Sequence, residues 1–356
     1  MSRILIMAGG TGGHVFPALA VAHKLQANGH DVYWLGTQRG IEARVVPAAG
    51  IAINYLSIEG VRGRGILGLL KAPFLIMCAL WQSMAAIKKF NADVVVGFGG
   101  FVSGPGGLAT WLLRKPLVIH EQNAVVGTTN RLLAPLSRYI ATGFDNVLKN
   151  GDWLGNPVRD AIALVPAPEL RMRDRDAEPV RILVLGGSLG AQAINQLLPE
   201  ALSEVSANTA VTVWHQSGAR HTESTLALYM LHQVNAKVEP FIEDMAGAYA
   251  WADLVICRAG ALTVSEIMAV GVAALLIPLP HAIDDHQTCN AAVLASAGAA
   301  LSIPQRDLDA RRLAHLLQGE LSDRERLLQM AMAARRLHKS EAALRMVEII
   351  EDITNG

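Results

Sequence analysis

The chain has 356 residues, of which 51% are hydrophobic and only 17% are charged. At about 100–200 residues per domain, this length predicts two domains. The positive mean hydropathy of +0.30 excludes a disordered or fibrous chain, and the formal net charge of zero gives no indication of a nucleic-acid partner.

The zero net charge conceals two oppositely charged halves. Residues 1–150 contain 14 Lys and Arg against 6 Asp and Glu, whereas residues 151–356 contain 17 against 25. Net charges of +8 and −8 favour two domains with different partners, and an anionic partner for the first. Uneven surface composition would give the same numbers, so charge alone leaves both interpretations open.

Cysteine spacing and apolar runs bear on the compartment. Cys78, Cys257 and Cys289 lie far apart, fit no metal-ligand spacing and indicate a reducing cytoplasm. The N-terminal apolar segment before Gly9 is too short for a signal peptide, and the run at 74–81 is well short of the ~18–20 residues that span a bilayer. These features predict a soluble or peripheral protein.

Short apolar runs rich in β-branched residues, with Gly or Pro after them, alternate with helix-like stretches. Buried parallel strands have this composition, so the alternation predicts an α/β fold with doubly wound parallel sheets. The predicted strands are 3–7, 32–35, 94–96, 117–120, 182–185, 211–215, 254–257 and 274–278.

An internal sequence repeat makes this prediction more specific. The sequence RILIMAGGTGG from Arg3 resembles RILVLGGSLGA from Arg181, with a one-residue shift, and the two copies start 178 residues apart. Each copy places glycines directly after a strand. We therefore expect two similar Rossmann-like halves in tandem, joined by a Pro-, Arg- and Asp-rich linker at 151–178 and followed by a charged helical stretch from 308 onward.

Glycine clusters occur at 9–13, 99–107 and 186–190. A glycine after a strand allows the backbone to approach a ligand closely, and the next helix N-terminus attracts anions. Any one cluster can equally be a tight turn, but three in one chain favour binding of a phosphate or diphosphate.

Two common phosphate-binding classes are excluded. A dinucleotide site needs an acidic residue at the end of the second strand, but that strand ends at 34–37 without a carboxylate. No P-loop pattern is present either.

His14 lies where the first helix is expected to begin. A helix N-terminus disfavours the imidazolium, so this histidine is a candidate general base; the alternative is a polar helix cap.

The second half contains a similar helix start after the strand at 254–257. Residues 258–266 (RAGALTVSE) would offer helix-end amides to a diphosphate and Glu266 to a ribose, and Gln287 and Asn290 could reach sugar hydroxyls. Asp284 with Asp285, or the D-x-D at 174–176, could be interpreted as a metal site. The D-x-D lies among basic residues of the linker, so we interpret it as solvated charge.

The ordered set of motifs resembles the MurG glycosyltransferases of bacterial peptidoglycan synthesis over nearly the whole chain. The matching segments are 9–17 (GGTGGHVFP), 99–107 (GGFVSGPGG), 120–123 (HEQN), 156–159 (NPVR), 186–190, 241–245 (FIEDM), 261–266 (ALTVSE) and 285–290. One departure is Leu189, where this family usually has glutamine.

The resemblance implies a GT-B fold: two Rossmann-like domains, 1–160 on the acceptor and membrane side and 161–340 on the donor side, with the active site in the cleft between them. A last helix at 341–356 would pack back on the first domain. The implied activity is inverting transfer of N-acetylglucosamine from UDP-N-acetylglucosamine to the 4-hydroxyl of the muramyl sugar of lipid I, giving lipid II and UDP, with no metal and no cofactor.

The resemblance also implies roles for residues. His14 is the candidate base, with Glu121 as its rival or orienting partner. Glu266 would hold the ribose, while Arg159 and the backbone of Ile242 would flank the uracil. The other implied substrate-binding residues are Thr11, Gly12, Gly13, Asn123, Ser188, Ala261, Leu262, Thr263, Val264, Ser265 and Gln287.

Because lipid I lies in the inner leaflet, the resemblance places the enzyme at the cytoplasmic face of the inner membrane as a peripheral protein. An apolar patch ringed by cations would contact an anionic membrane surface; the alternative is an ordinary buried helix. The patch residues are Leu67, Leu69, Leu70, Phe74, Leu75 and Trp81, with Arg62, Arg64, Lys71, Lys88 and Lys89.

Two other functions remain open from the sequence. Another GT-B enzyme on the same donor, such as a UDP-N-acetylglucosamine 2-epimerase, would need no membrane-facing patch. A non-catalytic nucleotide-sugar-binding or scaffold protein would release no UDP.

Overall fold

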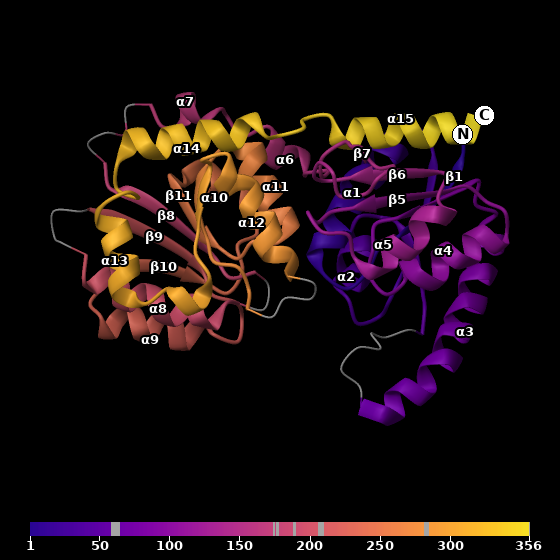
Figure 1. The fold of residues 1–356 in the computed structure, drawn as a ribbon, viewed down its shortest axis with the longest axis horizontal. Coiled ribbons are helices and arrows are strands. Elements are labelled where there is room, and N and C mark those ends of the chain that lie inside the picture. The colour runs from indigo at the N-terminus through magenta and orange to yellow at the C-terminus, as the bar shows by residue number, and fades with distance from the viewer. Residues whose placement is uncertain are drawn as a thin grey trace. The chain divides into compact units, whose positions relative to one another are not determined.

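The computed structural model describes residues 1–57, 65–173, 175, 178–187, 190–205, 210–280 and 285–355, with the backbone only for 65–72. The chain forms two compact units, which are described separately (Figure 1). Unit 1 comprises Met1–Arg159 and Lys339–Gly356, and unit 2 comprises Asp160–His338.

The described part of unit 1 contains a seven-stranded parallel sheet in the order β3-β2-β1-β4-β5-β6-β7. Its central strands are almost wholly buried, which explains their continuous apolar sequences. The strands are β1 (Arg3–Met7), β2 (Asp31–Gly36), β3 (Ala52–Tyr55), β4 (Val94–Gly97), β5 (Leu117–Glu121), β6 (Tyr139–Thr142) and β7 (Asp152–Trp153).

Helices cover both faces of this sheet. One core cluster joins the sheet to α1 (Gly12–Ala27) and α15 (Ala342–Asn355). The other joins it to α3 (Gly65–Phe90) and α4 (Ser103–Leu112), which also pack on each other. The shorter helices of unit 1 are α2 (Glu42–Ala48), α5 (Thr128–Leu133) and the 3-10 turn η1 (Ala134–Leu136).

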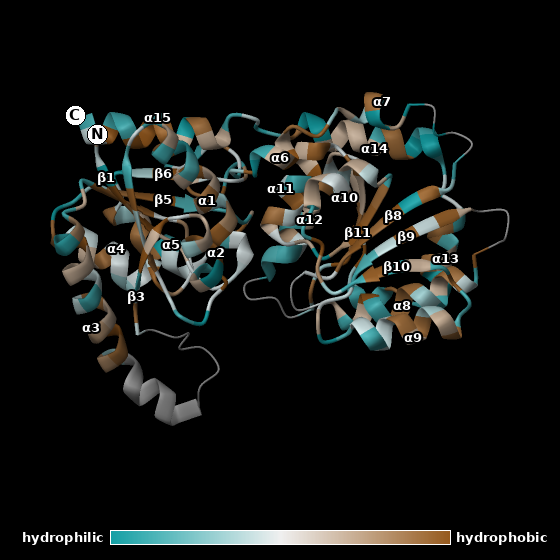
Figure 2. Ribbon diagram, turned by 180° about the vertical axis from the view of Figure 1, so that it is seen from behind, coloured by the Kyte–Doolittle hydropathy of each residue, from teal (hydrophilic) through white to brown (hydrophobic). Residues whose placement is uncertain are grey.

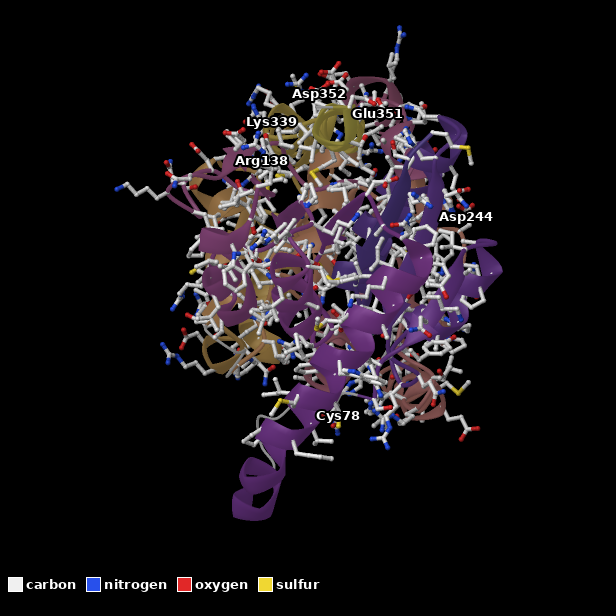
Figure 3. All side chains as sticks on the ribbon, turned by 90° about the vertical axis from the view of Figure 1, so that its right-hand side faces the viewer. Cys78, Arg138, Asp244, Lys339, Glu351 and Asp352 are labelled. Atoms are coloured by element: carbon white, nitrogen blue, oxygen red, sulfur yellow. The ribbon has the colours of Figure 1, made fainter. Side chains whose placement is uncertain are left out.

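The last helix, α15, completes the core of unit 1 by packing on α1. Met346 and Ile350 are fully buried there. At its far end, Glu351 accepts hydrogen bonds from Asn28 Nδ2 at 2.8 Å and His30 Nε2 at 2.9 Å. Figure 3 shows α15, with Glu351 labelled, at the opposite edge of unit 1 from Cys78 on α3.

Unit 2 repeats the architecture, with a six-stranded parallel sheet over its described residues in the order β10-β9-β8-β11-β12-β13. Figure 2 shows β8 and β11 as largely hydrophobic ribbons between amphipathic helices. The strands are β8 (Val180–Leu185), β9 (Val211–Gln216), β10 (Ala236–Glu239), β11 (Leu254–Cys257), β12 (Ala273–Leu276) and β13 (Ala300–Ser302).

Two groups of helices enclose the sheet of unit 2: α13 and α9 pack with α8, whereas α10, α12 and α14 pack with α11. The helices are α6 (Asp160–Ala163), α7 (Pro168–Arg171), α8 (Gln192–Ser203), α9 (Thr222–Leu231), α10 (Met245–Trp251), α11 (Ala261–Val270), α12 (His286–Ser296), α13 (Ala310–Gln318) and α14 (Arg324–Arg336), with a 3-10 turn η3 (Gln305–Asp307).

The structure confirms all eight predicted strands within one or two residues at each end. The described residues contain five further strands that were not predicted: β3, β6, β7, β10 and β13. All except β6 lie at the edges of the two sheets. The linker predicted at 151–178 is wrong in part, because the described residues there contain β7, α6 and α7. The strand β7 pairs with β6, and the two helices pack against α11 and α14 of unit 2.

Within the described residues, no helix combines the length and apolar character that crossing a bilayer would require.

Candidate functional site

The strand order reverses between β1 and β4 in unit 1, and between β8 and β11 in unit 2. In doubly wound sheets, ligands bind at the carboxyl ends of the strands at such a switch point. The glycine clusters at 9–13 and 99–107 follow β1 and β4, the cluster at 186–190 follows β8, and the segment 258–260 (RAG) follows β11. All the glycine clusters of the sequence are therefore at the expected ligand edge of their own unit.

His14 lies in the first turn of α1, where its backbone amide donates to the carbonyl of Thr11 at 3.2 Å. Its half-buried imidazole packs against Gly99. A Cβ at Gly99 would lie 2.9 Å from His14 Cδ2 and 3.1 Å from Nε2, and the backbone there has a φ of +97°. Only glycine fits this position without displacing the ring.

The two glycine clusters of unit 1 also touch each other through backbone atoms. A Cβ on Gly100, whose φ is +83°, would overlap the carbonyl oxygen of Gly9. Residues 9–14 and 99–100 thus form one surface, with Thr11 exposed and Gly12 and Gly13 half-buried.

Glu121, the last residue of β5, is buried and has donors on both carboxylate oxygens. Oε1 accepts from the backbone amide of Asn123 at 3.0 Å and from its Nδ2 at 3.2 Å. Oε2 accepts from Gly127 N at 3.0 Å and from Asn130 Nδ2 at 2.8 Å. These four bonds hold the segment 122–127 in place and also fix the side chain of Asn123.

His120 precedes this carboxylate and lies at the base of the same segment. Its Nε2 is 3.0 Å from the carbonyl of Gly155, and burial lowers the pKa of its imidazole to about 4. His120 is therefore neutral at pH 7 and donates from Nε2. It serves as a rigid support at the strand end.

Arg159 belongs to unit 1, where its guanidinium carbon lies 5.1 Å from the centre of the Phe16 ring on α1. Phe16 in turn contacts Gly12, because a Cβ there would be 2.9 Å from Phe16 Cε2. Arg159 is thereby linked through Phe16 to the start of α1.

Glu42 is a site residue that the sequence analysis missed. It is fully buried and accepts from the backbone amide of Gly10 and from Thr37. A dinucleotide site would have its acidic residue at the end of β2, whereas Glu42 lies six residues beyond Gly36, the last residue of that strand. The exclusion of a dinucleotide still holds, because both oxygens of Glu42 are occupied by the protein itself.

In unit 2, α11 begins at Ala261, with Gly260 in the N-cap position and no acidic residue in the first turn. The first amide bonded within this turn is that of Val264, which donates to Gly260 O at 2.9 Å. The preceding amides of Ala261, Leu262 and Thr263 point out of the helix end, as an anion site requires. The side chains of Val264 and Ser265 are buried, and the Ser265 hydroxyl donates to Ala261 O.

Glu266 lies one turn further and is only 4% exposed. Its Oε2 accepts a hydrogen bond from the hydroxyl of Tyr249, on α10, at 3.0 Å. Tyr249 is fully buried, so it fixes the carboxylate from the core side.

Gln287 on α12 organises the loop before α11. Its Oε1 accepts from the amides of Ala259 at 3.2 Å and Leu279 at 2.9 Å, which leaves Nε2 as the group available to a sugar. Asn290 differs from the expectation that it contacts the sugar, because it is fully buried and donates to Ala259 O.

Ile242 is buried, and its amide donates to Gln216 Oε1 at 3.0 Å. The neighbouring His215 lies 2.9 Å from the Tyr229 hydroxyl through Nδ1 and 3.0 Å from Asn195 Oδ1 through Nε2. Asn195 Nδ2 donates to Ser217 O, so Oδ1 is the acceptor and His215 Nε2 carries the proton. Burial lowers the pKa of His215 to about 3, which keeps this network neutral.

Several predicted positions lie outside the described residues: Ser188, Leu189, Asp174, Asp176 and Asp284. Among the described residues, no group of three or more His, Cys, Asp and Glu side chains is placed to hold a metal.

Comparison with known proteins gives a consistent result along the whole chain. Residues 4–142 match the glycosyltransferase family 28 N-terminal domain, and residues 181–347 match the glycosyltransferase family 28 C-terminal domain. The chain is 58% identical over 358 residues, covering 99% of both proteins, to the UDP-N-acetylglucosamine–N-acetylmuramyl-(pentapeptide) pyrophosphoryl-undecaprenol N-acetylglucosamine transferase of Cellvibrio japonicus. It is 50% identical over 357 residues, again 99% of both, to the protein of the same name from Nitrosococcus oceani.

A solved structure supports the same relationship. The crystal structure of Acinetobacter baumannii MurG matches with a TM-score of 0.84 and 42% identity, over 99% of this chain and 100% of that one.

Proposed function

The chain belongs to the MurG group of glycosyltransferase family 28. We propose that it transfers N-acetylglucosamine from UDP-N-acetylglucosamine to the 4-hydroxyl of the muramyl sugar of lipid I. The products are lipid II and UDP. The observation that carries the proposal is the 58% identity to a transferase of this name over 99% of both chains. The arrangement of His14 between two glycine loops at a switch point supports it.

In this reaction His14 is the general base. The imidazole removes the proton of the acceptor hydroxyl while the oxygen attacks the anomeric carbon, and the bond from that carbon to the UDP oxygen breaks with inversion. Its place at a helix N-terminus favours the neutral, proton-accepting form.

Glu121 is a positioning residue in this scheme. All four hydrogen bonds to its carboxylate come from residues 123–130 of its own segment. Donors on both oxygens stabilise the carboxylate and occupy the lone pairs that a base would need.

Unit 2 holds the donor. The first turn of α11 stabilises the negative charge that develops on the departing diphosphate, Glu266 accepts from the ribose hydroxyls, and Nε2 of Gln287 contacts the sugar. Ser188 is assigned to the phosphate and the backbone of Ile242 to the uracil, and Arg159 is the one residue of unit 1 that is also assigned to the uracil. The Ile242 amide already donates to Gln216, so the backbone carbonyl of Ile242 is the group proposed to contact the uracil.

Incubation of the purified chain with radiolabelled UDP-N-acetylglucosamine and a lipid I analogue, followed by butanol extraction, tests the proposal. We expect the label in the butanol phase. Label that remains in water as UDP-N-acetylmannosamine would instead support a 2-epimerase, and the absence of UDP release would support a non-catalytic binding protein.

We further propose that α3 docks unit 1 on an anionic membrane surface at the cytoplasmic face of the inner membrane. Phe74, Met77 and Trp81 lie at helical spacing and are 71%, 66% and 72% exposed. The opposite side of the helix, including Ala79 and Ile87, packs in the core.

Cations continue this apolar stripe. Lys88 and Lys89 are exposed in the last turn of α3, and Trp111 is exposed near the end of the neighbouring α4. An apolar stripe that ends in lysines suits the interface of an anionic bilayer. Arg62 and Arg64 lie outside the described residues, and the side chains of Leu67, Leu69, Leu70 and Lys71 do as well.

Vesicle flotation with anionic and neutral lipids tests the docking. We expect the wild type to float with anionic vesicles and the double variant Trp81→Ala, Lys88→Glu to remain in solution. Met230→Ala with Leu231→Ala is the control, since it removes exposed apolar side chains from α9 of unit 2. Unchanged flotation of the α3 variant would rule out this surface.

A further inference from the structure

The carboxylate of Glu42 lies behind the first glycine loop and binds it directly. Oε2 accepts from the amide of Gly10 at 2.9 Å, and Oε1 accepts from the amide of Thr37 at 2.9 Å and its Oγ1 at 2.7 Å. All three donors are neutral groups of the protein. The residue is 0% exposed, so its carboxyl group is held inside unit 1 by the glycine turn.

Three glycines make the space that this side chain occupies. A Cβ at Gly9 would lie 2.6 Å from Oε1, and a Cβ at Gly36 would lie 2.8 Å from Cγ. A Cβ at Gly40 would overlap the carboxylate itself. The glycines at 9, 36 and 40 therefore serve the side chain of Glu42, in addition to any role in turning the backbone.

The carboxylate connects the end of β2 to the loop that leads into the helix of His14. A backbone bond from Ile41 N to Gly10 O, at 3.3 Å, ties the same two segments together. Gly9 in turn contacts Gly100, which adjoins the Gly99 on which the His14 ring packs. Each step of this path is a direct contact in unit 1.

We propose that Glu42 is a positioning residue, which acts through the loop at 9–13 and sets the place of His14 relative to the acceptor hydroxyl. A misplacement of about 1 Å at a reacting group can lower a rate by about 100-fold, so a single buried contact behind the loop is sufficient for a large effect. The inference rests on the proposed glycosyl transfer for its kinetic test and has a second test that does not.

The kinetic test compares Glu42→Gln with the wild type at a temperature well below both unfolding midpoints. The variant keeps the length of the side chain but presents an NH2 group to one of the amides. We expect kcat to fall at least 10-fold, with the KM for UDP-N-acetylglucosamine unchanged within twofold. Gly40→Ala, which keeps Glu42 but displaces its carboxylate, should lower kcat similarly.

Rescue separates positioning from simple support of the fold. In Glu42→Ala, 100 mM acetate should restore kcat at least threefold, and chloride at equal ionic strength should not. Recovery of the unfolding midpoint by acetate without recovery of kcat would overturn the proposal. Glu351→Gln, which removes a bonded acid from α15 of the same unit, is the control and should retain wild-type kcat.

Hydrogen exchange gives the readout that does not depend on activity. Peptides that cover 9–13 should exchange faster in Glu42→Gln, while those that cover 258–264 of unit 2 should not change. Failure of the wild type to make lipid II would contradict the proposed function alone. Unchanged exchange at 9–13, or a kcat within twofold of the wild type, would contradict the role of Glu42.

Discussion

Both units have glycines directly after their first strand, but the loops that follow their strands are bound by side chains of different charge. In unit 1, the buried carboxylate of Glu42 binds the amide of Gly10 in the loop after β1, and the buried carboxylate of Glu121 binds the amide of Gly127 in the loop after β5. In unit 2, the neutral side-chain oxygens of Gln216 and Gln287 accept hydrogen bonds from the amides of Ile242 and Ala259, respectively. A carboxylate beside such a loop repels a phosphate, whereas a neutral carboxamide does not.

The comparison teaches that bulk charge and site charge are separate properties. The first half of the chain carries a net charge of +8 and the second −8, yet the second half is the one whose loops suit an anionic nucleotide. The positive charge of the first half lies on exposed residues such as Lys88 and Lys89. The four predictions below test this difference, from the largest effect to the smallest.

His14→Ala should abolish the chemical function of unit 1 and leave that of unit 2 intact. Loss of a general base lowers kcat by about 10²- to 10⁴-fold, while the KM for UDP-N-acetylglucosamine should stay within about threefold. Steady-state kinetics with a lipid I analogue measures both. His23→Ala, which changes an exposed histidine on the same helix, is the control. A wild-type kcat in His14→Ala would show that His14 is not the general base.

Acid should destabilise both units through histidines whose pKa is lowered by burial, foremost His120 in unit 1 and His215 in unit 2. Burial lowers the pKa of His120 to about 4 and of His215 to about 3, against about 6.5 in the unfolded chain. The unfolded state binds more protons below pH 6.5, so stability is complete above that pH and is lost as the pH falls toward these values. Between pH 7 and pH 5, each of these two histidines should lower the free energy of unfolding by about 2 kcal/mol.

Urea unfolding at the two pH values measures this loss. His215→Gln should reduce the pH dependence of the unfolding free energy by less than half, because His120 of unit 1 and His338 of unit 2, whose pKa burial also lowers to about 4, continue to titrate. An unfolding free energy that is the same at pH 7 and pH 5 would show that the networks around these histidines accept the proton without cost.

Glu266→Gln should weaken the donor side only. A hydrogen bond to a charged acceptor contributes about 1.5–3 kcal/mol, so the KM for UDP-N-acetylglucosamine should rise about 10-fold or more, with a smaller change in kcat. Isothermal titration with UDP provides an independent measurement. Glu223→Gln changes an exposed acid on α9 and should bind UDP as the wild type does.

Tyr249→Phe should give the smallest effect on the same ligand. The hydroxyl orients Glu266 without reaching the nucleotide, so its removal should raise the KM for UDP-N-acetylglucosamine only about two- to fivefold. An effect as large as that of Glu266→Gln would mean that the tyrosine contacts the nucleotide itself.

The parts of the fold that could be predicted are those buried on both sides. Central strands such as β1, β4 and β11 are continuous apolar runs, and the sequence marks them clearly. The strands β3, β7, β10 and β13 lie at sheet edges, where half-exposed residues such as those of AKVE in β10 have no such pattern. The role of an edge strand is decided by its neighbour, which a single segment does not encode.

The site divides in the same way. His14 and the helix start at Ala261 could be found because glycines after a strand mark them. Glu42, Tyr249 and Gln216 could not, because each acts on a residue distant in the sequence and carries no local motif of its own.

The packing of α15 into unit 1 also sets the order in which the two units can finish folding during synthesis. Unit 2 is one continuous segment of the chain, whereas the core of unit 1 needs Met346 and Ile350, which leave the ribosome only after all of unit 2 has been translated. The usual order, in which the N-terminal domain finishes first, is thereby reversed. Until α15 has been synthesised, the apolar side of α1 that it covers is exposed.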